Sequence, residues 1–249
     1  MPDRWHTEVL RSEFERASES FAERTRGRFD ELGVLEFSRI GERGKVLEVG
    51  VGTGNFLQLF SGEGRRLIGI DLTRAMLRKA REAGHRMELV EADGARLPVR
   101  SSSIELVTTA QTIHHIWEPL PVIKEMRRVA TERGKLLIVD QVATERYEEA
   151  TMMNRLDVLR DPSHASSRPA SALRTLLRAA DLRIADERIV EGSERLSNWM
   201  ASTEFPEDRI DKVRKFIEDH GAATGMNFEP DGNDYTFKRQ RIMLLAERA

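Results

Sequence analysis

The feature of this chain that most constrains its fold is an apolar segment that runs directly into a glycine-rich turn. Residues 46–56 read Val-Leu-Glu-Val-Gly-Val-Gly-Thr-Gly-Asn-Phe, so a hydrophobic strand delivers Gly50, Gly52 and Gly54. Glycine is needed where the backbone adopts positive φ angles or approaches a ligand closely, because a Cβ atom is excluded there. The segment therefore predicts a strand, a tight turn and a helix beside a bound ligand.

The spacing of the glycines distinguishes this turn from two common nucleotide-binding motifs. The dinucleotide fingerprint G-x-G-x-x-G would require a glycine at position 55, where this chain has Asn55. A P-loop is excluded as well, because no Gly-Lys-Ser/Thr sequence follows the turn. The turn therefore serves a different ligand.

Polar residues also close the next two predicted strands. Asp71 ends the second strand, where a carboxylate can accept hydrogen bonds from both hydroxyls of a ribose. Asp93 and Gly94 close the third strand, where an oxygen acceptor and a flexible backbone amide can meet an adenine. Three strand ends thus converge on one ribose-bearing ligand.

The hydrophobic pattern of the chain predicts an α/β sheet. Residues 8–29 carry apolar side chains at steps of three and four, which indicates an amphipathic helix. Apolar runs then alternate with charged helical stretches, as in a parallel sheet with crossover helices. We expect strands at 45–50, 67–71, 87–91, 104–110, 134–142, 182–191 and 236–246, and helices near 54–61, 74–83, 118–129, 169–180 and 206–220. The insertion at 143–168 is expected to help form the ligand crevice.

Composition narrows the classes of function. The 249 residues carry a formal net charge of -2, which provides no general attraction to phosphate backbones or anionic lipid. Nucleic acid and membrane are therefore not expected partners. The chain has no cysteine, which excludes disulfides, zinc–thiolate sites, a cysteine nucleophile and cysteine-ligated iron–sulfur clusters. We expect a soluble cytoplasmic protein.

The order of these motifs resembles that of class I S-adenosylmethionine-dependent methyltransferases, especially the branch of quinone-biosynthesis C-methyltransferases. The resemblance covers roughly residues 14–140. It implies an α/β, Rossmann-like, seven-stranded mixed sheet of order 3-2-1-4-5-7-6, with strand seven antiparallel and helices on both faces. We expect one domain over residues 1–249, with an N-terminal helical lid (1–33) and a small helical cap built from insertions at 143–168 and 192–235.

This resemblance also assigns residues that bind S-adenosylmethionine. Glu48 would face the amino group of the methionine portion, and the three glycines would face its methionine and ribose portions. Asp71 would hold the ribose hydroxyls and Asp93 the adenine amine. Leu72, Met76, Gly94 and Gln111 complete the implied cofactor-binding set.

The implied reaction is an in-line displacement at a sulfonium methyl group, for which positioning is the main task. A general base matters when the acceptor is a hydroxyl or an acidic carbon. His115 and His114, which follow the fourth strand, are the nearest candidates, because imidazole titrates close to neutral pH. In the first insertion, Arg160 and His164 are candidates for contacting an anionic or phenolic acceptor.

Two positions depart from the pattern of relatives. Many relatives carry Tyr where this chain has Phe21, so a hydroxyl contact with the cofactor carboxylate is lost, and Arg24 or Arg26 is a candidate to replace it. Metal-dependent relatives carry an acidic residue after the fourth strand, where this chain has Ala110 and Gln111. No metal site is therefore expected.

Three functions stay open at this point. The chain can be a methyltransferase acting on a small molecule such as a phenol, quinone or amine, a tRNA or protein methyltransferase, or a non-catalytic S-adenosylmethionine-binding protein. The first is favoured, because no RNA-binding module is readable in the sequence. The acceptor, the methylated atom and the oligomeric state, monomer or homodimer, are left open.

Overall fold

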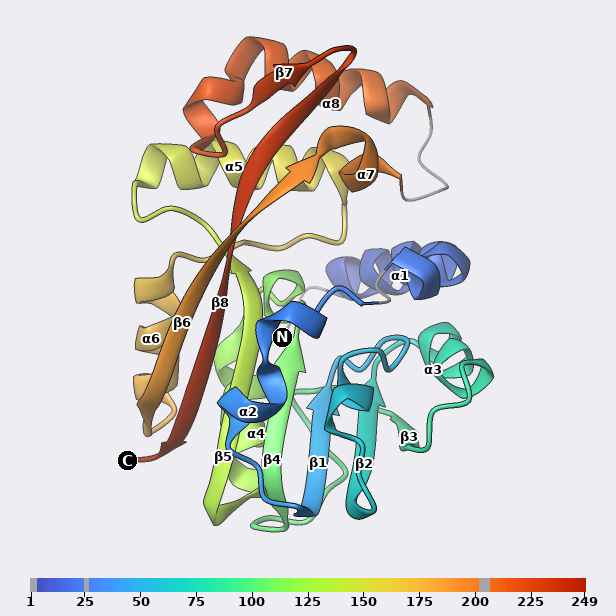
Figure 1. Cartoon of the computed structure of the whole chain (residues 1–249), viewed down its shortest axis with the longest axis vertical. Coiled ribbons are helices and arrows are strands. Elements are labelled where there is room, and N and C mark those ends of the chain that lie inside the picture. Colours follow the sequence, from blue (N-terminus) through green and yellow to red (C-terminus); the bar gives the residue numbers. More distant parts are fainter. Residues whose placement is uncertain (1–3, 25–26, 202–206) are drawn as a thin grey trace.

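A mixed β-sheet runs through the middle of the protein in its computed structural model, which describes residues 4–24, 27–201 and 207–249 (Figure 1). The strands of these residues are β1 (Arg43–Val49), β2 (Gly64–Asp71), β3 (Glu88–Glu91), β4 (Ile104–Ala110), β5 (Ala130–Val142), β6 (Leu182–Arg195), β7 (Glu229–Asp231) and β8 (Asp234–Arg248). Their α-helices are α1 (Arg4–Arg24), α2 (Val34–Ser38), α3 (Arg74–Glu82), α4 (Pro119–Val129), α5 (Tyr147–Arg160), α6 (Ala170–Ala179), α7 (Leu196–Met200) and α8 (Glu207–His220).

The strand order is β3-β2-β1-β4-β5-β8-β6, and the short strand β7 pairs with β8. Strands β1 to β5 pair in parallel, whereas β8 runs antiparallel to both β5 and β6. Strand β8 is the predicted seventh strand, so the predicted order and its antiparallel member are confirmed. The parallel strands place their carboxyl ends on one edge of the sheet, which lies uppermost in Figure 1.

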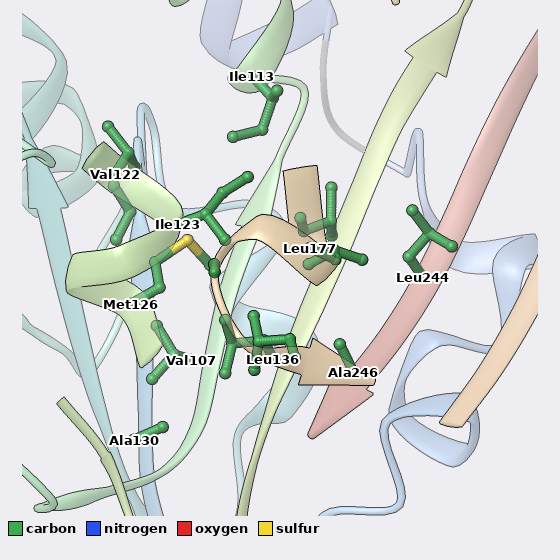
Figure 2. Close-up of a cluster of buried hydrophobic side chains, with 14 of the residues drawn as sticks. Val107, Ile113, Val122, Ile123, Met126, Ala130, Leu136, Leu177, Leu244 and Ala246 are labelled. Atoms are coloured by element: carbon green, nitrogen blue, oxygen red, sulfur yellow. The ribbon is translucent and has the colours of Figure 1, made fainter. Parts of the chain in front are cut away.

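Strand β5 shows why the centre of the sheet is buried on both faces. Leu136 packs into the core beneath α4 and α6, and its neighbour Leu137 packs into the core on the opposite face. Figure 2 shows the first of these cores, in which Ile123 and Met126 of α4 and Leu177 of α6 lie around Leu136. A continuous apolar run is the sequence pattern of such a strand, because both of its faces need apolar side chains.

A third apolar core lies above the sheet. Helices α5, α7 and α8 pack around the far end of β8, where Leu156, Trp199, Ile217 and Phe237 are buried together. Strands β6 and β8 carry the sheet into this cap, because they continue beyond the predicted ends at residues 191 and 236 (Figure 1). Residues 192–195 of β6 pair with residues 236–239 of β8, and residues 234 and 235 of β8 pair with β7. The extra residues are mostly polar, so no apolar run marks them in the sequence.

Two predicted elements differ from the structure. The helix expected at 54–61 is only a 3₁₀ helix, Leu57–Phe60, whose first and last side chains are fully buried. In a 3₁₀ helix the side chains at i and i+3 lie on the same side, so this short turn buries both against the sheet. The hydrophobic pattern predicted no helix range within 143–168, where the structure has the helix α5.

Candidate active site

A cavity of about 280 Å³ opens at the carboxyl ends of β1, β2 and β4 and beside the end of β3. The glycine turn after β1 forms one wall, and α1 contributes the opposite side through His6, Thr7, Leu10 and Phe14. Helix α1 lies over the upper ends of β1 and β2 in Figure 1. The cavity therefore occupies the crevice where open α/β sheets bind their ligands.

The glycine turn adopts the conformation that its sequence predicts. Gly50, Gly52 and Gly54 have φ angles of 75°, 53° and 83°. A Cβ atom on Gly50 would lie 2.4 Å from the side chain of Thr112, so the turn excludes any larger residue there. Gly50 and Gly52 line the cavity, whereas Gly54 packs against Met87 outside it. Gly54 thus shapes the turn without facing the ligand space.

Asp71, at the end of β2, connects the turn to the cavity. Its carboxylate accepts hydrogen bonds from the backbone N–H groups of Gly52 and Thr73, each at 2.8 Å. Burial raises the pKa of this carboxyl, although the two backbone hydrogen bonds oppose the shift. Each carboxylate oxygen keeps a further lone pair, so the same side chain can accept from two ribose hydroxyls.

Two buried polar atoms that line the cavity lack any hydrogen-bond partner among the described residues. They are Oε2 of Glu48 and Nε2 of Gln111. Glu48 is only 1% exposed, and burial, followed by the charge of Asp71, raises its pKa well above the usual range. Gln111 has a φ of 50°, an uncommon conformation for a residue other than glycine. Unpaired buried polar atoms are costly, so they point to a ligand that supplies a donor and an acceptor.

The remaining predicted cofactor residues meet at the same cavity. Leu72 and Met76, which follow β2, line it, as do Asp93 and Gly94, which follow β3. The Oδ1 atom of Asp93 accepts a hydrogen bond from the backbone N–H of Ala95 at 2.9 Å, which orients the carboxylate. Nine of the ten predicted positions therefore surround one space, and Gly54 is the exception.

Arg28 also lines the cavity, although the sequence analysis missed it. Its Nη2 atom donates a hydrogen bond to Oε1 of Gln111 at 3.2 Å. Burial, with the nearby charge of Arg241, lowers the pKa of this guanidinium to about 9. Among the described residues no carboxylate lies within ion-pair distance of it. A buried cation of this kind favours an anionic partner, which a ligand carboxylate can provide.

No local pattern marks Arg28, because one arginine among many charged residues near the end of a helix looks ordinary. The sequence predicts its neighbours Arg24 or Arg26, rather than Arg28, as the residue that contacts the cofactor carboxylate. Arg26 lies outside the described residues, and so do the side chains of Arg24 and Phe21. The predicted contacts of these three residues therefore stay predictions.

The two adjacent histidines occupy different environments. His115 lines the cavity, and its ring lies edge-on to that of Phe14 with 5.0 Å between centroids. His114 faces away from the cavity, with Nδ1 2.5 Å from Oδ1 of Asp140. Burial lowers the pKa of His114 well below its ordinary value and raises that of Asp140 to about 6. His114 therefore forms part of the buried support beneath the site.

Arg160 and His164 lie in the cap rather than at the cavity. Arg160 stacks over the ring of Trp199 at 4.8 Å and donates from Nε to the carbonyl oxygen of that residue at 2.9 Å. His164 is 4% exposed, and its Nε2 atom lies 2.8 Å from Oδ1 of Asn154.

The cavity walls differ from the expectation for the first insertion, because no residue between 143 and 168 lines them. Helix α5 packs instead on the extended end of β8. Phe237 provides an apolar contact there, and Arg239 forms an ion pair with Asp157 of α5. The insertion contacts residues behind the cavity instead, through the backbone of His114, the ring of His115 and hydrogen bonds from Arg168 to the carbonyl oxygens of Ile116 and Trp117.

The structure also bears on metal binding and on membrane-spanning segments. The described residues contain no group of three or more His, Asp or Glu side chains arranged to hold a metal ion. None of the helices within the described ranges is long and apolar enough to cross a bilayer.

Comparison with known proteins agrees with the fold. Residues 47–138, which span β1 to the middle of β5, match the family model of the methyltransferase domain. This match and the sheet order show a methyltransferase domain of the S-adenosylmethionine-dependent kind with an α/β, Rossmann-like fold.

Individual relatives cover different shares of the chain. The uncharacterized methyltransferase YcgJ of Bacillus subtilis is 26% identical over 174 residues, which are 68% of this chain and 69% of YcgJ. The crystal structure of YcgJ superposes with a TM-score of 0.78 at 22% identity, covering 87% of this chain and 97% of that structure.

Two further relatives are named for their acceptors. A phosphatidylethanolamine N-methyltransferase of Cereibacter sphaeroides is 35% identical over 109 residues, 41% of this chain and 53% of the relative. A demethylmenaquinone methyltransferase of Renibacterium salmoninarum is 26% identical over 96 residues, 39% and 40% of the two chains. The chain thus spans about half or less of the length of these two relatives.

Proposed function

We propose that this protein transfers the methyl group of S-adenosylmethionine to a small-molecule acceptor. The observation that carries the proposal is the pair of unpartnered atoms at the cavity, the Oε2 atom of Glu48 and the Nε2 atom of Gln111. The Oε2 atom of Glu48 can accept a hydrogen bond from the ammonium group of the methionine portion, and the neighbouring carboxylate of Asp71 attracts the same charge. Asp71 can also accept hydrogen bonds from the ribose hydroxyls. These residues fit S-adenosylmethionine and not merely any nucleotide.

The other cavity residues complete the binding of this cofactor. Asp93 and the backbone of Gly94 would hold the adenine, and Leu72 and Met76 would pack against its apolar surface. We assign the carboxylate of the methionine portion to Arg28, in place of the predicted Arg24 or Arg26. When bound, the cofactor supplies an activated methyl group on a sulfonium sulfur. The residues around it then align the acceptor with that methyl group and exclude water.

The acceptor would lie between the strand ends and α1. Leu10, Phe14 and Trp117 give this side an apolar, aromatic lining, and His115 provides a titratable group. Such a lining suits an aromatic or otherwise apolar acceptor, which includes phenols, quinones and hydrophobic amines. The relatives are named for chemically different acceptors, so the quinone branch stays a prediction. The cytoplasmic location is part of the same proposal.

Two measurements test the proposal. Calorimetry should show binding of S-adenosylmethionine and S-adenosylhomocysteine with no comparable affinity for NAD, and a labelled methyl group should then move to members of a panel of phenols, quinones and amines. A preference for NAD would remove the cofactor assignment. Cofactor binding without transfer to any member of this panel, together with transfer to bulk tRNA at low salt, would favour the RNA-modifying alternative.

A further inference from the structure

The cap segment that follows α5 contacts the ring of His115 directly. The Nδ1 atom of His115 lies 2.9 Å from the carbonyl oxygen of Ser163. A carbonyl oxygen can only accept a hydrogen bond, so this contact places the ring proton on Nδ1. The other nitrogen, Nε2, then carries the free lone pair, and it forms no hydrogen bond with any described residue. The ring lines the cavity, so the ring nitrogen able to accept a proton belongs to the site.

A carboxylate stands behind this contact. The hydroxyl of Ser163 donates to Oδ1 of Asp161 at 2.6 Å, and the backbone N–H of Ser163 donates to the same oxygen at 2.9 Å. The hydroxyl oxygen also lies 3.2 Å from Nδ1 of His115. Asp161, Ser163 and His115 therefore form a continuous chain of hydrogen bonds that begins in the cap and ends at the cavity.

The charge at the far end of this chain is permanent at neutral pH. Burial alone would raise the pKa of Asp161, but His115, Arg160 and the hydrogen bonds from Ser163 outweigh it and hold the pKa at about 2. A negative charge close to His115 stabilises the imidazolium form. Ser163 joins the two groups and fixes the tautomer of the ring, as a second partner does for many functional histidines.

The remaining neighbours of His115 restrict its ring without competing for Nε2. From α1, the Nε2 atom of His6 donates to the carbonyl oxygen of His115 at 2.9 Å, and the ring of Phe14 packs edge-on. The ring of His114 lies 4.2 Å away and that of His164 6.4 Å away, between centroids. The nearby charged groups are Asp161 with Arg160, and Asp140.

We propose that Asp161 and Ser163 are positioning residues that hold His115 as a general base, and that the acceptor is a molecule whose attacking atom bears a proton, such as a phenol. The inference rests on the proposed function. In this step Nε2 takes the proton of the acceptor hydroxyl while the acceptor oxygen bonds to the methyl carbon of S-adenosylmethionine. The bond from that carbon to sulfur breaks, and its electron pair stays on sulfur. The imidazolium then releases the proton to water.

The first test needs neither the acceptor nor a variant. The imidazole ¹⁵N chemical shifts of His115, measured in the unaltered protein by NMR, should show a protonated Nδ1 and an unprotonated Nε2 above the titration range. The opposite tautomer overturns the inference.

Kinetics with an acceptor from the panel provide the second test. Asp161→Asn and Ser163→Ala should reduce kcat/KM by tenfold or more at neutral pH, with a defect that shrinks as pH rises because the acceptor then loses its proton unaided. Ser163→Thr keeps the hydroxyl and should restore most of the activity. The control Ser171→Ala removes an exposed serine that also donates to a carboxylate, that of Glu145, and should change nothing.

The affinity for S-adenosylhomocysteine separates the two proposals. The variants at Asp161 and Ser163 should bind it as the unaltered protein does, because neither residue lines the cavity. Failure of the unaltered protein to bind it would remove the proposed function itself. Normal binding with unaltered turnover in all variants overturns only the role of the chain from Asp161 to His115. If Asp161→Asn does not fold, Ser163→Ala and the tautomer measurement decide the question.

Discussion

The cavity and the cap each bury a carboxylate almost completely, and the two carboxylates differ in what surrounds them. Glu48, at the cavity, is 1% exposed and leaves one oxygen without a partner among the described residues. Asp157, in the cap, is 3% exposed and accepts hydrogen bonds from the guanidinium of Arg239 and from the hydroxyl of Ser167. The same kind of side chain is thus open to a ligand in one region and satisfied by the protein in the other.

This difference separates buried groups that can bind a ligand from buried groups that stabilise the fold. A buried charge that the protein itself pairs contributes to folding, and its loss leaves the partner uncompensated. A buried polar atom that the protein leaves unpaired lowers stability until a ligand completes it. Substitutions in the two regions should therefore have opposite signatures: lost stability with intact affinity in the cap, and lost affinity with nearly intact folding at the cavity.

The largest effect is expected from Arg239→Met in the cap. The substitution leaves Asp157 buried without its cation, so the free energy of unfolding should fall by about 3–5 kcal/mol in urea denaturation. Affinity for S-adenosylhomocysteine should be unchanged in the folded protein. The matched control is Arg195→Met, whose ion pair with Asp231 is about half exposed and should cost about 1 kcal/mol or less. If Arg239→Met instead binds S-adenosylhomocysteine more weakly at unchanged stability, the cap contributes to the cofactor site.

Gly50→Ala should give the largest effect at the cavity. A methyl group there would meet the side chain of Thr112 at 2.4 Å on a backbone with a φ of 75°, so the turn must move. We expect affinity for S-adenosylhomocysteine, measured by calorimetry, to fall at least 100-fold, or about 2.8 kcal/mol. The control is Gly192→Ala, in the part of β6 that extends into the cap, where no atom lies within 4 Å of the new methyl group. This variant should bind S-adenosylhomocysteine normally. Equal affinities for the two variants would contradict the assignment of the turn.

Asp71→Ala should have a smaller effect on the same measurement. The variant loses the acceptor for both ribose hydroxyls and one support of the glycine turn, and hydrogen bonds to a charged group contribute about 2 kcal/mol, or roughly 30-fold in affinity. The control is Glu91→Ala, which removes an exposed carboxylate at the end of the neighbouring strand β3. A folded Asp71→Ala protein that binds as tightly as this control would refute the ribose contact.

The smallest expected effect is the pH dependence of stability that the cap contributes. Burial lowers the pKa of His164 from its ordinary 6.5 to about 4. As pH falls the unfolded chain therefore binds the proton before the folded protein does, and stability is lost from about pH 6.5 down toward pH 4. Between pH 6.5 and 5.5 this residue should account for about 1 kcal/mol.

His164→Gln tests this contribution, because glutamine can keep a hydrogen bond to Asn154 but cannot titrate. Urea denaturation at several pH values should show a shallower loss of stability in the variant than in the unaltered protein. Parallel curves would mean that His164 takes up its proton at the same pH in the folded and unfolded protein, and would contradict the prediction. Affinity for S-adenosylhomocysteine at neutral pH should match in both proteins.

The sheet and the cofactor half were predictable because their signals are local. A run such as Leu136–Val139 identifies a strand buried on both faces, and Gly50, Gly52 and Asp71 stand at the ends of such runs. The parallel arrangement then brings every strand end to one edge, so knowing the order of the elements was enough to predict that these residues meet. Gly54 does not line the cavity, and the sequence alone cannot separate it from Gly50 and Gly52, because a glycine required by turn geometry and one required by a ligand look alike.

Only the tertiary structure decided where the cap residues and Arg28 lie. The sequence places Arg160 and His164 after a sheet strand, and it cannot show that Arg160 stacks on Trp199 of α7 or that His164 contacts Asn154 of α5. Arg28 and Gln111 lie 83 positions apart and meet only when the segment after α1 folds across the strand ends. The sequence by itself therefore determined the elements, their order and the cofactor edge, because those depend on neighbouring residues. The partners of buried polar groups depend on contacts between distant segments, and these exist only in the folded chain.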